Sequence, residues 1–161
     1  HDAAEARLEQ MSAQHYASFG APALKSFALQ WLIDRHPLIR PDTLKSFANE
    51  MVSVSVLARV ARAYGMEEKL LAHNPAELSN LATKPHILAG TFEAHIGMYF
   101  AQVMDGTMPF TVLKEYLSEL FDSEMFADLR MRLEAAHKAN LDQEQDVSSS
   151  KADTTAANPP N

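Results

Sequence analysis

The sequence predicts an all-α protein, and three observations lead to this fold class. Apolar residues recur at helical spacing along most of the chain, as at Leu57, Val60 and Tyr64. Prolines and glycines fall between these apolar segments. The strand-like alternation of apolar and polar residues is confined to the short stretch "VSVSV". With 161 residues, of which 47% are hydrophobic, the chain is expected to form one domain with a real core.

The N-terminal third of the chain is expected to hold two helical segments. Residues 1–12 are predicted to be an arm or a partial helix, and residues 23–35 an apolar helix with Pro22 in its first turn. Two prolines in "HPLIRPD" end this helix. The next helix is expected to take Asp42 or Thr43 as its cap.

The following segment, up to Gly65, is predicted to be helical with a joint at Val52–Ser53. Gly65 is a suitable C-terminal residue because glycine adopts the left-handed conformation readily. The stretch after it, "EEKLLAHNPAELSNLATKP", is expected to be mostly loop with short turns.

Three further segments are predicted in the C-terminal half. Residues 86–104 form a central helix, and Pro109 begins another. A last amphipathic helix follows, with Asp122 or Ser123 as its cap. Residues 141–161 have few large apolar side chains, which predicts a polar, disordered tail.

Composition excludes several classes of protein. The chain has no cysteine, so disulfides and thiolate metal sites are excluded. No apolar run reaches the roughly 18 residues that a transmembrane helix needs. The net charge is −7, whereas a free nucleic-acid binder is usually basic. The first residue is His1 rather than Met, which fits a removed presequence or a fragment.

Three stretches, in this order, resemble the ribonuclease III endonuclease domain family. They are "AQHYASFGAP" at 13–22, "FANEMVSVSVLARVARAYGM" at 47–66 and "ILAGTFEAHIGM" at 87–98. The third stretch matches the family pattern "ILADTVEALIGA" most specifically, and the first keeps little more than Phe19 and Gly20. The resemblance implies a ribonuclease III-like helical domain over residues 13–140.

The resemblance also implies where a metal site would lie. In the family, acidic residues of the first and third stretches hold divalent metals that activate water. Magnesium prefers oxygen ligands, and two-metal hydrolysis needs several carboxylates. Four of these acidic positions are occupied by uncharged residues, and one keeps its glutamate; in order they are Gln14, Ala17, Ala21, Gly90 and Glu93. The expectation is a pseudo-nuclease with no catalytic residues, no metal and no cofactor.

The candidate contact residues follow from the resemblance and from charge. Family members pair through the first stretch, so the dimer-contact candidates are Tyr16, Phe19, Ala23 and Phe27. Residues 25–84 carry a net charge of +2, which suggests phosphate contacts there. The RNA-contact candidates are Lys25, Arg35, Arg40, Lys45, Arg59 and Arg62. Gly90 is expected to allow close packing against another helix.

Taken together, the resemblance implies a structural component of the mitochondrial large ribosomal subunit, located in the matrix. It would pair with a second ribonuclease III-like protein and contact ribosomal RNA and neighbouring ribosomal proteins. The separate double-stranded RNA-binding domain of active relatives is expected to be absent. Two alternatives stay open: an inactive subunit of an RNA-processing heterodimer, and a helical protein–protein adaptor.

Overall fold

The computed structural model describes residues 3–73 and 84–155, and within these ranges it is all-α with no strand. The helices of the first half are α1 (Ala3–Arg35), α2 (Pro41–Met51), α3 (Val54–Ala63) and α4 (Met66–His73). Those of the second half are α6 (Pro85–Met104), α7 (Phe110–Asp122), the short 3₁₀ helix η1 (Glu124–Phe126) and α8 (Ala127–Thr155). The predicted fold class is therefore confirmed.

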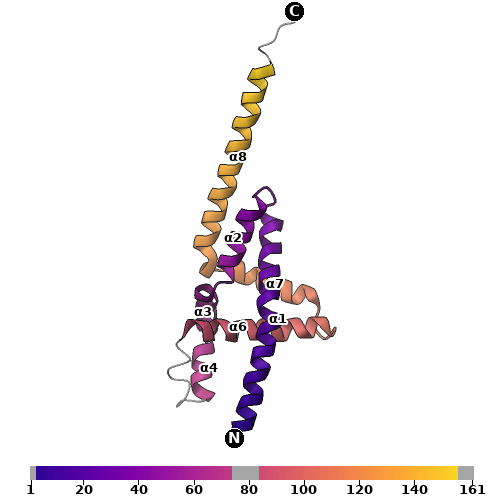
Figure 1. Ribbon diagram of the computed structural model, residues 1–161, viewed down its shortest axis with the longest axis vertical. Helices are drawn as coiled ribbons and strands as arrows, with labels where there is room; N and C mark the ends of the chain where they lie inside the picture. The colour runs from indigo at the N-terminus through magenta and orange to yellow at the C-terminus, as the bar shows by residue number, and fades with distance from the viewer. Residues whose placement is uncertain (1–2, 74–83, 156–161) are drawn as a thin grey trace, which may run out of the picture.

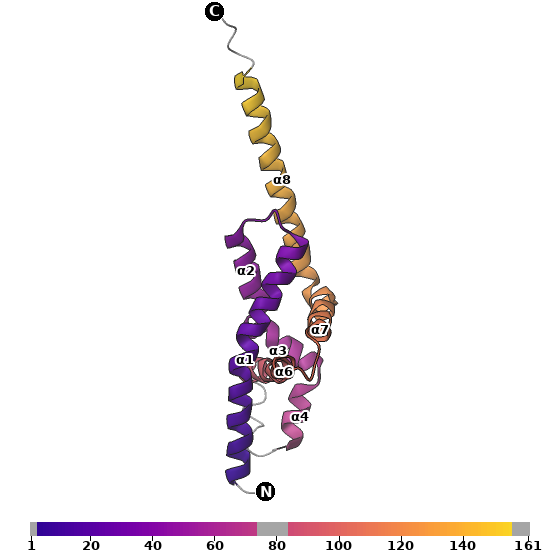
Figure 2. The same cartoon turned by 90° about the vertical axis from the view of Figure 1, so that its right-hand side faces the viewer.

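Two long helices give the molecule its elongated shape. Figure 1 shows α1 and α8 running along the long axis, with α6 lying across α1 near the middle. Figure 2 views α6 nearly end-on and shows α1 passing beside it. The first turns of α1 and the last turns of α8 project from opposite ends of the body.

The core lies where α6 meets α1 and α3, because these two helix pairs make the most extensive contacts. Fully buried side chains from each helix fill it, such as Leu24 on α1, Val60 on α3 and Phe92 on α6. A second layer comes from the buried face of α7 and the first turns of α8, where Phe121 and Leu133 are buried. Burying a side chain of this size stabilises a fold by roughly 1.5–3 kcal/mol.

Several predicted boundaries are confirmed. The joint at Val52–Ser53 separates α2 from α3, and Gly65 takes a φ of +70° just after α3. The central helix begins at Pro85 and ends at Met104. Residues other than glycine rarely adopt this left-handed backbone conformation, which explains the glycine at position 65.

The predicted break before residue 23 is wrong, because α1 continues through Pro22 without interruption. Proline lacks an N–H, so the carbonyl of Ser18 loses its normal intrahelical partner. Pro22 is exposed, and the next two residues, Ala23 and Leu24, are buried. Packing of the flanking residues against α6 outweighs the local cost of the proline.

Three other expectations also need correction. Part of the expected loop after Gly65 is helix α4, while residues 74–83 lie outside the described ranges. Helix α2 begins at Pro41 with Arg40 as its cap residue, so neither Asp42 nor Thr43 has that role. Proline is favoured in the first turn because its missing N–H would have no intrahelical partner there.

The expected disordered tail is helical as far as Thr155, because α8 extends well beyond residue 141. The side chains of residues 142–154 are exposed, so the composition correctly predicts that this segment buries no core. Its backbone groups bond within the helix, and the hydroxyl of Ser148 also donates to the carbonyl of Glu144 at 2.8 Å. Residues 156–161 lie outside the described ranges. None of the described helices is both long and apolar enough to cross a bilayer.

Candidate functional site

Two glycines mark the point where α1 and α6 cross, and there the two backbones touch. A Cβ added at Gly20 would lie 1.7 Å from the carbonyl oxygen of Glu93, and one added at Gly97 would lie 1.8 Å from that of Tyr16. No side chain fits at such distances, and a backbone carbonyl cannot move aside as a flexible side chain can. The crossing therefore requires glycine at both positions.

This crossing brings together the two stretches that the family resemblance singles out. Gln14, Ala17 and Ala21 lie on α1, and Gly90 and Glu93 lie on α6. Gln14 is exposed, and the other four residues are partly buried. Only one of the five positions, Glu93 on α6, carries a carboxylate. The three positions on α1 offer a carboxamide and two methyl groups.

Glu93 is held in a partly buried place on α6. Burial raises the pKa of its carboxyl group above the ordinary value, because desolvation disfavours the charged form. A metal-ligating carboxylate would need to be deprotonated, and burial works against this. Within residues 3–73 and 84–155, no group of three or more His, Asp or Glu side chains is placed to hold a metal ion.

Gly90 does not make the close helix contact that the sequence predicted. A Cβ at this position would meet no atom within 4 Å, so the position is open. Close packing belongs instead to Gly97, one of the matched residues of the same stretch. Sequence alone could not separate the two glycines, because both lie in one helix and the partner helix is distant in sequence.

The six RNA-contact candidates differ in whether they have a partner within the described part of the chain. Three of them are engaged within the chain: Arg35 pairs with Asp122, Arg59 reaches the carbonyl of Met125 at 3.4 Å, and Arg62 pairs with Glu67 at 3.1 Å. Lys25, Arg40 and Lys45 are exposed on α1 and α2 or just before α2. The latter three are the better placed to meet a phosphate.

The four dimer-contact candidates differ in how much surface they offer. Phe19 is 54% exposed, whereas Ala23 is only 6% exposed. Tyr16 and Phe27 are partly buried. Phe27 stacks on Phe110 of α7 with ring centroids 5.4 Å apart, so part of its surface is already covered.

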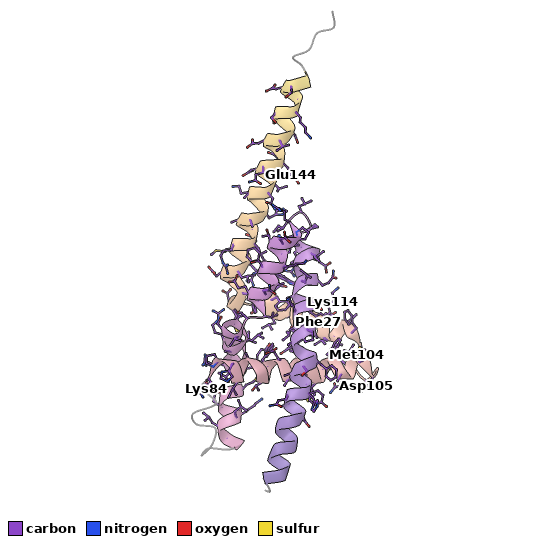
Figure 3. The ribbon with its side chains drawn as sticks, in the orientation of Figure 1. Phe27, Lys84, Met104, Asp105, Lys114 and Glu144 are labelled. Carbon is purple, nitrogen blue, oxygen red and sulfur yellow. The ribbon has the colours of Figure 1, made fainter. Side chains whose placement is uncertain are left out.

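Phe19, Ala23 and Phe27 border an open groove of about 760 Å³ between α1 and α7. The α7 wall, which contributes Phe110 and Lys114, was not predicted. Figure 3 shows Phe27 and Lys114 near one another on these neighbouring helices. The groove is mainly apolar, and its charged lining residues are paired: Arg35 with Asp122, which lies outside the groove, and Lys114 with Asp34 at 4.0 Å.

A cluster of aromatic side chains on α6, on α7 and just after α3 was also missed. Tyr64 lies near Phe92 and Tyr116, with ring centroids 5.9 and 6.2 Å away. Burial, chiefly, and the neighbouring Tyr64 raise the pKa of Tyr116. His95 packs edge-on against Tyr99 at 4.7 Å, and burial lowers its pKa. This environment favours neutral groups and a packing role for the cluster.

Comparison with known proteins gives one family. The ribonuclease III domain matches residues 14–103, which cover more than half of the chain and include both stretches at the crossing. No curated protein and no solved structure gives a significant match.

Proposed function

The chain belongs to the ribonuclease III domain family, and from this premise we propose that it acts as a non-catalytic pairing subunit. Its proposed place is the mitochondrial large ribosomal subunit, in the matrix. There it pairs with a second ribonuclease III-like protein and helps to scaffold ribosomal RNA and neighbouring proteins.

The observation that carries the proposal is the composition of the α1–α6 crossing. Two-metal hydrolysis of a phosphodiester needs several oxygen ligands that balance the charge of two divalent ions. Of the five positions that are acidic in the family pattern, only Glu93 keeps a carboxylate, and burial raises the pKa of that group. One carboxylate with a carboxamide cannot balance the charge of two such ions, so the crossing is better suited to structure than to hydrolysis.

The groove between α1 and α7 supports pairing. Phe19 is a large aromatic side chain exposed beside an apolar groove on the same helix. Aromatic anchors that enter apolar pockets dominate the energetics of many protein interfaces. The neighbouring charges already have partners within the chain, so an apolar surface of the partner fits the groove best.

Contacts with RNA are proposed to be few. The net charge of −7 disfavours extensive binding to phosphates, and the second subunit would supply most of the RNA affinity. Lys25, Arg40 and Lys45 are exposed cations in the N-terminal third of the sequence, and they would add contacts that position the protein on RNA. Such contacts orient a protein on RNA without reading its sequence.

A paired substitution tests the proposed pairing. Phe19→Asp places a charge at the groove, whereas Ile33→Asp places the same charge at an exposed apolar position of α1 outside the groove. Affinity purification of each tagged variant, followed by mass spectrometry, would measure how much of the second ribonuclease III-like chain it retains. We expect Phe19→Asp to lose at least about tenfold, in the range of a hot-spot residue, and Ile33→Asp to retain the wild-type amount.

A nuclease assay on the same purified complex tests the absence of catalysis. The wild-type complex and a Glu93→Gln complex are each incubated with double-stranded RNA and Mg²⁺. We expect no cleavage above a magnesium-free control in either sample. Magnesium-dependent cleavage that Glu93→Gln abolishes would contradict the proposal, as would equal loss of the partner from both α1 variants.

A further inference from the structure

Helix α8 is attached to the body by a small set of contacts near its beginning. Leu129 and Leu133 are buried. Arg132 forms a bidentate ion pair with Glu50 of α2, in which one N–O distance is 3.0 Å. From residue 142 to residue 154 the side chains are exposed, and Figure 3 shows Glu144 on the part of α8 that projects from the body. The position of this projecting arm depends on the few contacts at its base.

One of those basal contacts joins two histidines. His36 directly follows α1, and His137 lies on α8 one turn beyond Leu133. Their rings meet edge-on, with centroids 5.6 Å apart and planes inclined at 61°. The Nδ1 atom of His137 is buried and has no hydrogen-bond partner in the described part of the chain. A contact of this kind is suited to neutral imidazoles.

The surroundings of His36 oppose its protonation. Burial is the largest influence and lowers the pKa of His36, and both His137 and Arg35 act in the same direction. Glu134, on α8, is the one neighbouring group that favours the charged form of His36. Arg35 is itself paired with Asp122, which fixes its guanidinium near the site.

We propose that the His36–His137 contact is a pH-sensitive latch, which holds the part of α8 beyond Leu133 against the α1–α2 corner when His36 is neutral and releases it when His36 is protonated. Protonation places a positive charge on a partly buried ring that lies near the guanidinium of Arg35. Movement of the part of α8 beyond Leu133 costs little elsewhere, because Leu129 and Leu133 stay buried. The α1–α6 crossing lies away from this contact and stays closed.

The direction of the pH dependence follows from linkage. A histidine whose pKa is lower in the docked state than its ordinary value of 6.5 binds fewer protons docked than released. Docking is therefore strongest above pH 6.5 and weakens as the pH falls below it. Each extra proton bound by the released state shifts the equilibrium about tenfold per pH unit.

Distance measurements between two labels can detect the release. The chain has no cysteine, so Lys45→Cys on α2 and Lys138→Cys on α8 provide unique sites for spin labels. The double variant His36→Gln/His137→Gln in the same labelled background is the matched control, because glutamine does not titrate. Double electron–electron resonance at pH 8 and at pH 5 gives the two distance distributions.

We expect a longer-distance population that grows at low pH in the histidine-containing protein and stays constant in the glutamine variant. If the whole chain unfolds in acid, the latch predicts that the acid midpoint, followed by far-ultraviolet circular dichroism, lies at lower pH in the glutamine variant. Identical pH profiles for the two proteins would overturn the proposal, as would an unchanged distance in a folded wild-type chain at pH 5.

Discussion

Substitution of Gly97 by alanine is the sharpest perturbation that the structure offers. The new methyl group would lie 1.8 Å from the carbonyl oxygen of Tyr16, whereas ordinary contacts begin at 3.4 Å. Because the obstacle is backbone, α1 and α6 must move apart along the most extensive helix contact in the fold. The packing lost there is comparable to that of a large-to-small core substitution.

The expected cost follows from two opposing contributions. Loss of packing in a core of this kind costs about 3–5 kcal/mol, and replacing a helical glycine by alanine returns about 1 kcal/mol. The free energy of unfolding should therefore fall by about 2–4 kcal/mol. Gly90→Ala is the matched control, because it makes the same change in the same helix where no atom lies within 4 Å. That variant should be more stable than wild type by about 0.5–1 kcal/mol.

Urea denaturation followed by circular dichroism measures both variants. The midpoint concentration should fall for Gly97→Ala and rise for Gly90→Ala, with similar slopes if each change acts on the folded state. Gly20→Ala should resemble Gly97→Ala, and the double variant should cost less than the sum because the crossing is already open. Equal stability of Gly97→Ala and Gly90→Ala would refute the backbone contact.

Two further substitutions test local features of the two crossing helices. Pro22→Ala restores a donor for the carbonyl of Ser18 on an exposed part of α1 and should raise the free energy of unfolding by about 1–2 kcal/mol, as urea denaturation would show; no gain would mean that the proline is not a local defect. Glu93→Gln should raise stability at pH 7, because burial raises the pKa of Glu93 and the folded chain therefore disfavours its charged form. This difference between variant and wild type should shrink as the pH falls through the raised folded-state pKa toward the unfolded-state value of 4.5, below which both states are protonated, and unfolding curves at pH 7 and pH 4 would contradict it by showing a constant difference.

The sequence was sufficient for those features that depend on neighbours along the chain. The period of the apolar residues located the central helix, and Gly65 located the end of α3, because both signals are local. The prediction that the helix begins at Pro22 was wrong, because packing of α1 on α6 outweighs the local cost of the proline. The prediction of a disordered tail was wrong as far as Thr155, because a segment without core residues can still form a helix.

The candidate site could be predicted only in part. The resemblance singled out the first and third stretches, and the structure brings them together where Gly20 meets Glu93 and Gly97 meets Tyr16. It could not tell that Gly97, rather than Gly90, makes the close contact. Nor could it find the α7 wall of the groove or the histidine pair, because these contacts join residues far apart in sequence.

Sedimentation tests the central claim most directly. The tagged protein from a mitochondrial lysate is separated on a sucrose gradient at moderate salt, and its fractions are identified by mass spectrometry. The account predicts that it migrates with the large ribosomal subunit, together with a second ribonuclease III-like chain. Migration as a small free complex, without ribosomal proteins, would contradict it.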